Sequence, residues 1–325
     1  MEGPIFESRI NLVQFSEQVK KIKAEIGKVI VGQSNLIDLL ITALLADGHV
    51  LIEGVPGVAK TLTAKLFARI LSVDFSRIQF TPDLMPSDVM GTAVFNLKVS
   101  EFEFRPGPIF SNIVLIDEIN RAPAKTQSAL FEVMEERQVT VDGSTHPMKK
   151  PYMVLATQNP IEHEGTYRLP EAQLDRFIFK LLVGYPNLEE EMTILSNNHG
   201  REGVSPLDEV RPQLTAADIE AMKRCAQQVH VEKNLIQYIA QIVQETRNNP
   251  LLFLGASPRA SLALLNATKA FALIQGRDFI SPEDVKHLAL PVLRHRVALS
   301  PEKEMEGLST DEIMDQLVNK IEVPR

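Results

Sequence analysis

Hydrophobic residues recur along this chain at two characteristic spacings, and each spacing indicates a different kind of element. Residues 8–28 have apolar positions at three- and four-residue steps, which predicts an amphipathic helix. Those positions are Leu12, Phe15, Val19, Ile22 and Ile26. A second helix is expected over residues 34–47, after the break at residues 29–33.

Five short apolar runs predict β-strands, at residues 49–54, 76–80, 112–118, 153–159 and 177–183. Helical patterns lie between some of them, at residues 60–71 and 121–137. Apolar strands that alternate with helices are typical of an α/β fold, in which helices cover both faces of a parallel sheet. Ligands of such sheets bind at the carboxyl ends of the strands.

Two segments interrupt this alternation and are expected to form β-hairpins. Residues 92–107 alternate in hydrophobicity, and residues 137–150 contain an Asp-Gly pair between two short strands. The pattern becomes helical after residue 188, so we expect two domains, at residues 1–188 and 189–325, the second all-helical. Its helix starts are expected at Asp218, Ser257 and Ser281.

Composition narrows the class of protein. The 325 residues are 44% hydrophobic and 23% charged, as in ordinary globular proteins, and no apolar run is long enough to span a membrane. A single cysteine, Cys225, fits a reducing compartment, and the first residues do not resemble a signal peptide, so we expect a cytoplasmic protein. The net charge of −8 argues against nucleic-acid binding.

The sequence GVPGVAKT at residues 54–61 nearly matches the phosphate-binding loop G-x-x-x-x-G-K-[ST]. It joins a predicted strand to a predicted helix, so backbone N–H groups and the amino end of that helix could surround a phosphate. Lys60 is expected to reach the β- and γ-phosphates, and the Thr61 hydroxyl to bind Mg²⁺. The template has glycine where this chain has Ala59. We expect a negative φ at Ala59, with any positive φ at a glycine such as Gly57.

Polar residues follow two other predicted strands. Asp117 and Glu118 end the run IVLIDE, where Asp117 is expected to hold Mg²⁺ through water and Glu118 to act as general base on water. Asn159 ends the run LATQN, where its amide could donate to the γ-phosphate or orient the water; it could equally be a turn residue before Pro160.

Two arginines lie near helix boundaries in apolar surroundings. Arg176 is in the segment LPEAQLDRF and Arg259 is in GASPRAS. A guanidinium group can stabilise the charge on a transferring phosphoryl group, although either arginine could instead form an ordinary surface ion pair.

These residues resemble the MoxR family of AAA+ ATPases. The similarity lies in VIVGQ, LIEGVPGVAKT, VLIDEINRAPAKTQSALFEVMEERQVT, VLATQNPIEHEGTYRLPEAQLDRF and GASPRAS, which together span about residues 29–262. The resemblance implies a P-loop NTPase core with a helical lid, and makes Asn159 sensor 1, Arg176 an arginine finger acting on a neighbouring subunit, and Arg259 sensor 2. It makes residues 29–33 the adenine wall, and the two hairpins the helix-2 and pre-sensor-1 insertions.

The resemblance also implies ATP and Mg²⁺ as cofactors, a ring hexamer, and client proteins that include von Willebrand factor A-type domains, in complex assembly, activation or metal insertion. The expected nucleotide contacts are Val31, Gly32, Gly54, Val55, Pro56, Gly57, Val58, Ala59, Lys60, Thr61 and Leu62. The alternatives are a nucleotide-dependent scaffold with little turnover, a magnesium-chelatase-like subunit and, less favoured by the acidic balance, a nucleic-acid motor.

Overall fold

A five-stranded parallel sheet forms the centre of the molecule. The computed structural model describes residues 12–324 except for residues 56, 99, 160–166, 168 and 202. The strands run in the order β2-β5-β8-β1-β9. Their bounds are β1 (His49–Gly54), β2 (Phe75–Gln79), β5 (Ile113–Asp117), β8 (Met153–Gln158) and β9 (Phe177–Val183). All four strand pairs are parallel, so the carboxyl ends of all five strands meet at one edge of the sheet.

Both faces of the sheet are buried, which explains why the strands are continuous apolar runs. Val50 and Ile52 on β1 face one hydrophobic cluster, which contains α1 (Leu12–Gly27), α2 (Ser34–Leu45) and α3 (Lys60–Ile70). Leu51, between them, faces a second cluster that contains α4 (Pro86–Met90) and α5 (Ala124–Glu136). The predicted α/β fold with helices on both faces is therefore confirmed.

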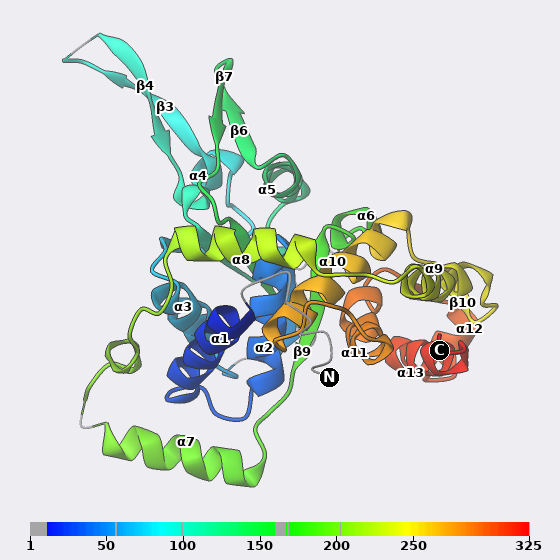
Figure 1. Cartoon of the computed structure of the whole chain (residues 1–325). Coiled ribbons are helices and arrows are strands. Elements are labelled where there is room, and N and C mark those ends of the chain that lie inside the picture. Colours follow the sequence, from blue (N-terminus) through cyan, green and yellow to red (C-terminus); the bar gives the residue numbers. More distant parts are fainter. Residues whose placement is uncertain are drawn as a thin grey trace.

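The two hairpins form where the pattern predicts them, and they project from the same side of the molecule (Figure 1). The first pairs β3 (Gly91–Asn96) with β4 (Glu101–Pro106), and the second pairs β6 (Gln138–Val141) with β7 (Ser144–Pro147). Asp142 and Gly143 both have positive φ, 49° and 77°, as a tight hairpin turn requires. The rings of Phe104 and His146 stack at 4.1 Å between centroids and join the two hairpins.

The remaining short elements connect these parts. They are η1 (Pro108–Phe110), η2 (Ile119–Arg121), α6 (Glu171–Leu174), α7 (Leu188–Gly200) and η3 (Pro206–Glu209). None of the α7 residues is buried, and Figure 1 shows this helix at the opposite end of the molecule from the hairpins. The predicted domain boundary at residue 188 falls at the start of α7 and stays a prediction.

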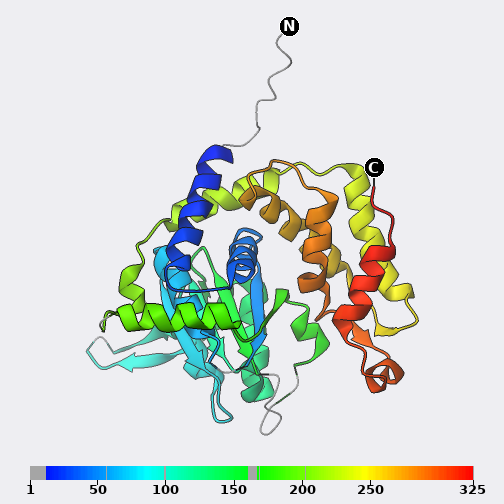
Figure 2. The same cartoon turned by 90° about the horizontal axis from the view of Figure 1, so that it is seen from below.

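The C-terminal part is helical, with one small antiparallel strand pair that the pattern does not predict. Its elements are α8 (Ala216–Gln228), α9 (Lys233–Asn248), β10 (Leu252–Leu254), α10 (Pro258–Ile274), α11 (Pro282–Leu293), β11 (Ala298–Leu299), α12 (Pro301–Met305) and α13 (Thr310–Lys320). We call this part, residues 216–320, the lid. Figure 2 shows most of its helices beside the sheet.

Two of the three predicted helix starts in the lid are confirmed. Ser257 and Ser281 are N-caps whose side chains accept a backbone N–H, and each is followed by a proline. The expectation at Asp218 is wrong, because the N-cap of α8 is Thr215 and Asp218 is the third helical residue. The Asp218 carboxylate in turn accepts the Thr215 N–H, so the two residues form a capping box.

One hydrophobic cluster joins the lid to the sheet. The cluster on the α1–α3 face continues without a break into residues of α8, α9, α10 and α11. The lid helices are therefore held against the sheet face through apolar packing as well as through the polar contacts described below. Within the described residues, no helix combines the length and apolar character that a membrane span requires.

Candidate functional site

The glycine loop between β1 and α3 has the strand-loop-helix context that phosphate binding requires. A Cβ at Gly54 would lie 2.6 Å from the Val183 carbonyl oxygen, so the close approach of β9 demands glycine there. Gly57 has the expected positive φ, 89°, and no atom lies within 4 Å of the place a Cβ would occupy. Pro56 lies outside the described residues.

The expectation of a negative φ at Ala59 is wrong. Ala59 has φ 59° and ψ 19°, in the left-handed region. It is the N-cap of α3, and an N-cap residue lies outside the helix and need not adopt helical angles. The loop therefore places positive φ at both positions 57 and 59, and Ala59 carries a backbone strain of about 1–2 kcal/mol that glycine would avoid.

Lys60 is the first residue of α3 and folds back over the loop, where its ammonium group donates to the Gly54 carbonyl oxygen. Burial lowers the pKa of Lys60, and the nearby carboxylates of Asp117, Glu118 and Glu53 oppose this effect. Asp117 and Glu118 are therefore close enough to Lys60 to affect its pKa. Thr61, the next residue, is partly buried in the first turn of α3, whose N–H groups can bind an anion.

Asp117 and Glu118 lie at the end of β5 and are held differently. Asp117 is buried, and its carboxylate accepts from Arg77 Nε at 2.6 Å and from Thr157 Oγ1 at 3.2 Å. Glu118 has a left-handed φ of 58° and is partly exposed. Its carboxylate accepts from Gln79 Nε2 at 2.9 Å and lies 3.0 Å from Arg121 Nε.

Asn159 completes this edge of the sheet. It is buried directly after β8, the strand that lies between β5 and β1. The strand order therefore brings the glycine loop, the acid pair and Asn159 to adjacent positions. Gln79 and Thr157, which donate to the two acids, are not among the expected site residues. Gln79 has the same sequence signal as Asn159, because it is a polar residue at the carboxyl end of a predicted strand.

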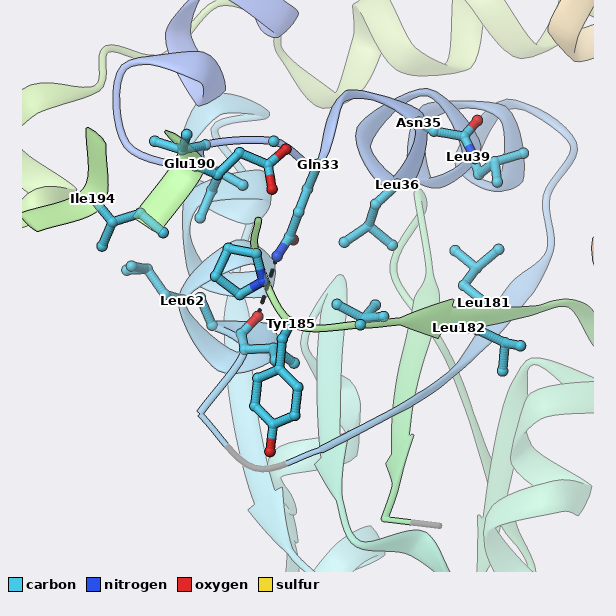
Figure 3. Close-up of a pocket in the computed structure, with 18 of the residues that line it drawn as sticks. Gln33, Asn35, Leu36, Leu39, Leu62, Leu181, Leu182, Tyr185, Glu190 and Ile194 are labelled. Atoms are coloured by element: carbon cyan, nitrogen blue, oxygen red, sulfur yellow. Dashed lines mark hydrogen bonds between the residues drawn. The ribbon is translucent and has the colours of Figure 1, made fainter. Parts of the chain in front are cut away.

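A cavity of about 780 Å³ lies beside the loop and is mostly lined by apolar side chains (Figure 3). Six of the residues expected to contact nucleotide line it: Val31, Gly32, Gly57, Val58, Ala59 and Leu62. Gly54, Val55, Lys60 and Thr61 are not on its wall. Its size and apolar character suit a purine base and ribose.

Polar side chains close part of the cavity. Figure 3 shows Gln33, Tyr185 and Glu190 around it, and Gln33 Nε2 donates to the Val58 carbonyl oxygen at 3.4 Å. A Cβ at Gly32, which has φ 75°, would lie 2.2 Å from Glu190 Oε1. Glycine therefore lets the α7 carboxylate approach the cavity wall.

The lid also contributes to the cavity, which the sequence analysis did not predict. Residues of α11 and its C-cap line the wall: His287, Leu290, Pro291 and Arg294. No local pattern marks these residues, because α11 reaches the cavity only through the packing of the lid on the sheet.

The two predicted arginines lie away from this edge. Arg176 immediately precedes β9, so it lies at the amino end of the sheet, where Phe177 pairs with His49. It donates to the Phe131 carbonyl oxygen, and its Nε lies 3.9 Å from the Glu135 carboxylate. Arg259, on the first turn of α10, donates to the same carboxylate at 2.9 Å. Glu135 therefore brings the two arginines together.

Comparisons with known proteins agree with this architecture. Residues 49–179 match the ATPase family associated with various cellular activities (AAA), and residues 244–317 match the AAA lid domain. A crystal structure of a Cytophaga hutchinsonii protein assigned as an ATPase superposes with a TM-score of 0.89 at 39% identity, over 97% of both chains.

Relatives of similar length give a more specific result. The chain is 48% identical to the uncharacterised protein YeaC of Bacillus subtilis over 94% of both chains. It is 44% identical to Chaperone MoxR1 of Mycobacterium tuberculosis, over 93% of this chain and 81% of the relative. Protein MoxR of Paracoccus denitrificans is 27% identical over 90% of this chain. With the sheet order, the loop and the lid described above, these similarities show that the chain belongs to the MoxR family of AAA+ ATPases.

Proposed function

We propose that this protein hydrolyses ATP and uses the reaction to remodel partner protein complexes, as a chaperone-like ring. One observation carries the proposal: the strand order brings the glycine loop with Lys60, the acid pair Asp117 and Glu118, and Asn159 to adjacent positions at the carboxyl edge of the sheet. This edge adjoins a cavity of nucleotide size. That arrangement has a cation for phosphates, a carboxylate for a metal and a carboxylate for water in one place.

The residues present fit a magnesium nucleotide. Mg²⁺ prefers oxygen ligands and in such sites takes one or two from the protein, the others being water and phosphate oxygens. The Thr61 hydroxyl would supply one here, and the Asp117 carboxylate, which accepts from Arg77, would hold the ion through water. When bound, the ion would neutralise charge on the phosphates; Asn159 would donate to the γ-phosphate or orient the attacking water.

Glu118 is the proposed general base. Its carboxylate accepts from Gln79 and forms an ion pair with Arg121, so its orientation depends on these partners. Under the proposed function, release of the Gln79 contact frees this carboxylate to accept a proton from water.

Arg176 is proposed to act on the nucleotide of a neighbouring subunit, and Arg259 is proposed to be sensor 2. The seven residues of β9 extend from Arg176 to the end of the strand that pairs with Gly54, and at about 3.3 Å per residue this distance is roughly 23 Å. An arginine side chain cannot bridge it. Since AAA+ ATPases typically form oligomers, we propose a ring hexamer in which each subunit supplies its Arg176 to the next.

The client remains a proposal from the resemblance. One relative is named a chaperone, and the family similarity favours complex assembly, activation or metal insertion, with von Willebrand factor A-type proteins among the clients.

The experiment that tests the proposed chemistry is Glu118→Gln, which keeps the size of the side chain and removes the base. We expect ATP hydrolysis to fall by at least about 100-fold while ATP affinity stays within a few-fold, since general bases contribute roughly 10²–10⁴. Steady-state phosphate release and equilibrium binding of a fluorescent ATP analogue measure the two quantities. Glu302→Gln, the same change on exposed α12, is the matched control.

Turnover that survives in Glu118→Gln would remove Glu118 as the base. A wild-type rate no higher than that of the variant would instead favour the nucleotide-dependent scaffold.

A further inference from the structure

Arg296, in the lid, makes an unusually complete set of contacts with the segment that carries Arg176. Its side chain is 2% exposed. Nε donates to Asp175 Oδ1 at 2.7 Å, and Nη2 donates to the carbonyl oxygens of Asp175 and Phe177 at 3.1 and 2.6 Å. Nη1 donates to the Ile178 carbonyl oxygen at 3.1 Å and to that of Val292. The guanidinium fork thus binds the backbone on both sides of Arg176.

The neighbours of Arg296 connect the same segment to the nucleotide cavity. Arg294, two residues earlier, lines the cavity. His295 Nε2 donates to the Phe177 carbonyl oxygen at 2.8 Å. Three consecutive lid residues therefore run from the cavity wall to the amino end of β9.

Asp175 joins the segments of both predicted arginines. One carboxylate oxygen accepts from Arg296, and the other accepts from Ser257 Oγ at 2.8 Å. Asp175 directly precedes Arg176, and Ser257 is the N-cap two residues before Arg259. A shift of Asp175 would therefore move both arginines.

We propose that Arg296 is a positioning residue for Arg176: bound to Asp175, it sets the place of the arginine that the subunit presents to its neighbour. The inference rests on the proposed function. An arginine is suited to this task because its planar fork fixes several acceptors at once, whereas a lysine binds as a point charge and cannot reproduce that geometry.

The consequence for turnover follows from geometry. Arg176 reaches a neighbouring nucleotide only from a defined position, and a misplacement of about 1 Å in a catalytic group can cost roughly 100-fold in rate. Loss of the fork should therefore lower hydrolysis by the neighbour, while the subunit's own nucleotide pocket still binds. A purely structural role would not produce this separation.

The test is Arg296→Lys, with Arg277→Lys as the matched control. Arg277 also makes a two-pronged ion pair, with Asp284 at 2.6 and 2.7 Å, but wholly within the lid. We expect Arg296→Lys to lower kcat by roughly 10- to 100-fold with ATP-analogue affinity within about two-fold of wild type. Arg277→Lys should leave kcat within about two-fold, whatever the two variants lose in thermal stability.

Mixing subunits distinguishes a displaced arginine from a damaged pocket. An Arg296→Lys subunit keeps its pocket, and a Lys60→Ala subunit keeps its arginine. Their mixture should therefore hydrolyse ATP faster than either variant alone. Equal losses of kcat in the two lysine variants, an affinity loss of ten-fold or more, or no rescue on mixing would each overturn the proposal.

Two further measurements keep the test decisive. If Arg296→Lys does not fold, Asp175→Asn, which removes the same ion pair with little change in shape, takes its place with the same expected results. Arg176→Ala is measured in parallel. Full turnover in Arg176→Ala would refute the trans arginine of the proposed function, whereas loss of turnover there and not in Arg296→Lys would refute the positioning role alone.

Discussion

The two ends of the central sheet differ in how their polar groups are arranged. At the carboxyl end, Lys60, Asp117 and Glu118 lie at the edge that adjoins a large cavity, and the backbones of Ala59 and Glu118 there are in the left-handed region. At the amino end, Arg176 and Arg259 share the carboxylate of Glu135. The carboxyl end adjoins an open cavity, whereas the two arginines at the amino end are both held by the Glu135 carboxylate. Strain and open volume at the first end are typical of a binding site.

This difference suggests a separate role for each end of the sheet. The carboxyl end has the groups that we propose to bind and activate a nucleotide, and the amino end has cations that are one strand length away from it. Under the proposed function, a subunit binds its own nucleotide at one end of the sheet and assists its neighbour's from the other. The predictions below test that separation.

The largest expected effect comes from disabling the two ends in different subunits. Lys60→Ala removes the phosphate-binding cation, and Arg176→Ala removes the cation proposed for the neighbour. Each variant alone should lose ATP hydrolysis by at least about 100-fold, as loss of such charge-stabilising groups typically does. ATP affinity should fall only in Lys60→Ala. Mixed in equal amounts, the two variants should recover part of the wild-type rate of phosphate release.

If mixing does not restore hydrolysis, Arg176 does not act on the neighbour's nucleotide. The two ends of the sheet would then have to function within the same subunit. Unchanged nucleotide affinity in Lys60→Ala would count against the loop itself. The control for subunit exchange is a mixture of Lys60→Ala with Glu118→Gln. Both changes disable the same end, so this mixture should not recover.

A smaller effect concerns pH and the amino end of the sheet. His49 and His295 are both buried there, and burial lowers the pKa of each well below its usual value. His49 Nδ1 accepts the Val154 N–H at 2.9 Å, so the ring is neutral with its proton on Nε2. His295 donates to the Phe177 carbonyl oxygen.

The direction of these pKa shifts determines how the free energy of unfolding changes with pH. Because both pKa values are lowered on folding, the unfolded chain binds more protons once the pH falls below about 6.5, the value of an unperturbed histidine. The stabilisation is fully present above that pH and is lost below it, at up to about 1.4 kcal/mol per pH unit for each histidine. Urea unfolding between pH 7.5 and 5.5 measures the slope.

Comparison with an exposed histidine checks the location of this effect. His199→Gln, on exposed α7, should leave the slope unchanged, and His295→Gln should reduce it. A slope that is the same in wild type and His295→Gln would show that His295 is not a source of the pH dependence.

The smallest effect is expected at Ala59. Glycine relieves the left-handed strain of about 1–2 kcal/mol but loses more entropy on folding, by about 0.4–1 kcal/mol. Ala59→Gly should therefore raise the free energy of unfolding by about 0.5–1 kcal/mol. Chemical denaturation without nucleotide measures it. Ala64→Gly, inside α3, is the control and should destabilise by about 1 kcal/mol or more. A similar destabilisation by Ala59→Gly would contradict the left-handed backbone.

How far the sequence predicts the structure also differs between the two ends. The carboxyl end follows from local patterns: the loop, the acid pair and Asn159 each end an apolar strand, and parallel strands bring such ends together. Even there, the prediction of a negative φ at Ala59 is wrong, because a residue that adjoins the first helical residues need not share their backbone angles.

The amino end could not be predicted in the same way. The sequence singles out Arg176 and Arg259 as arginines in apolar surroundings. No feature of the neighbouring sequence indicates their common partner Glu135. The bond between Arg296 and Asp175 joins residues 121 positions apart, and it forms only because the lid packs on the sheet. Periodicity and motif spacing carry no information about such pairs, and for the same reason the α11 side of the cavity was missed.

The row of lid contacts along β9 has a consequence for solubility. β9 is an edge strand, and the side chains of residues 294–296 donate hydrogen bonds to the carbonyl oxygens of Phe177, Ile178 and Lys180. Unpaired edge strands recruit strands from other molecules and promote aggregation. The lid thus shields a surface that would otherwise be open to intermolecular sheet extension. A fragment that ends at residue 188 would expose this strand, and the two predicted domains are therefore unsuited to separate production.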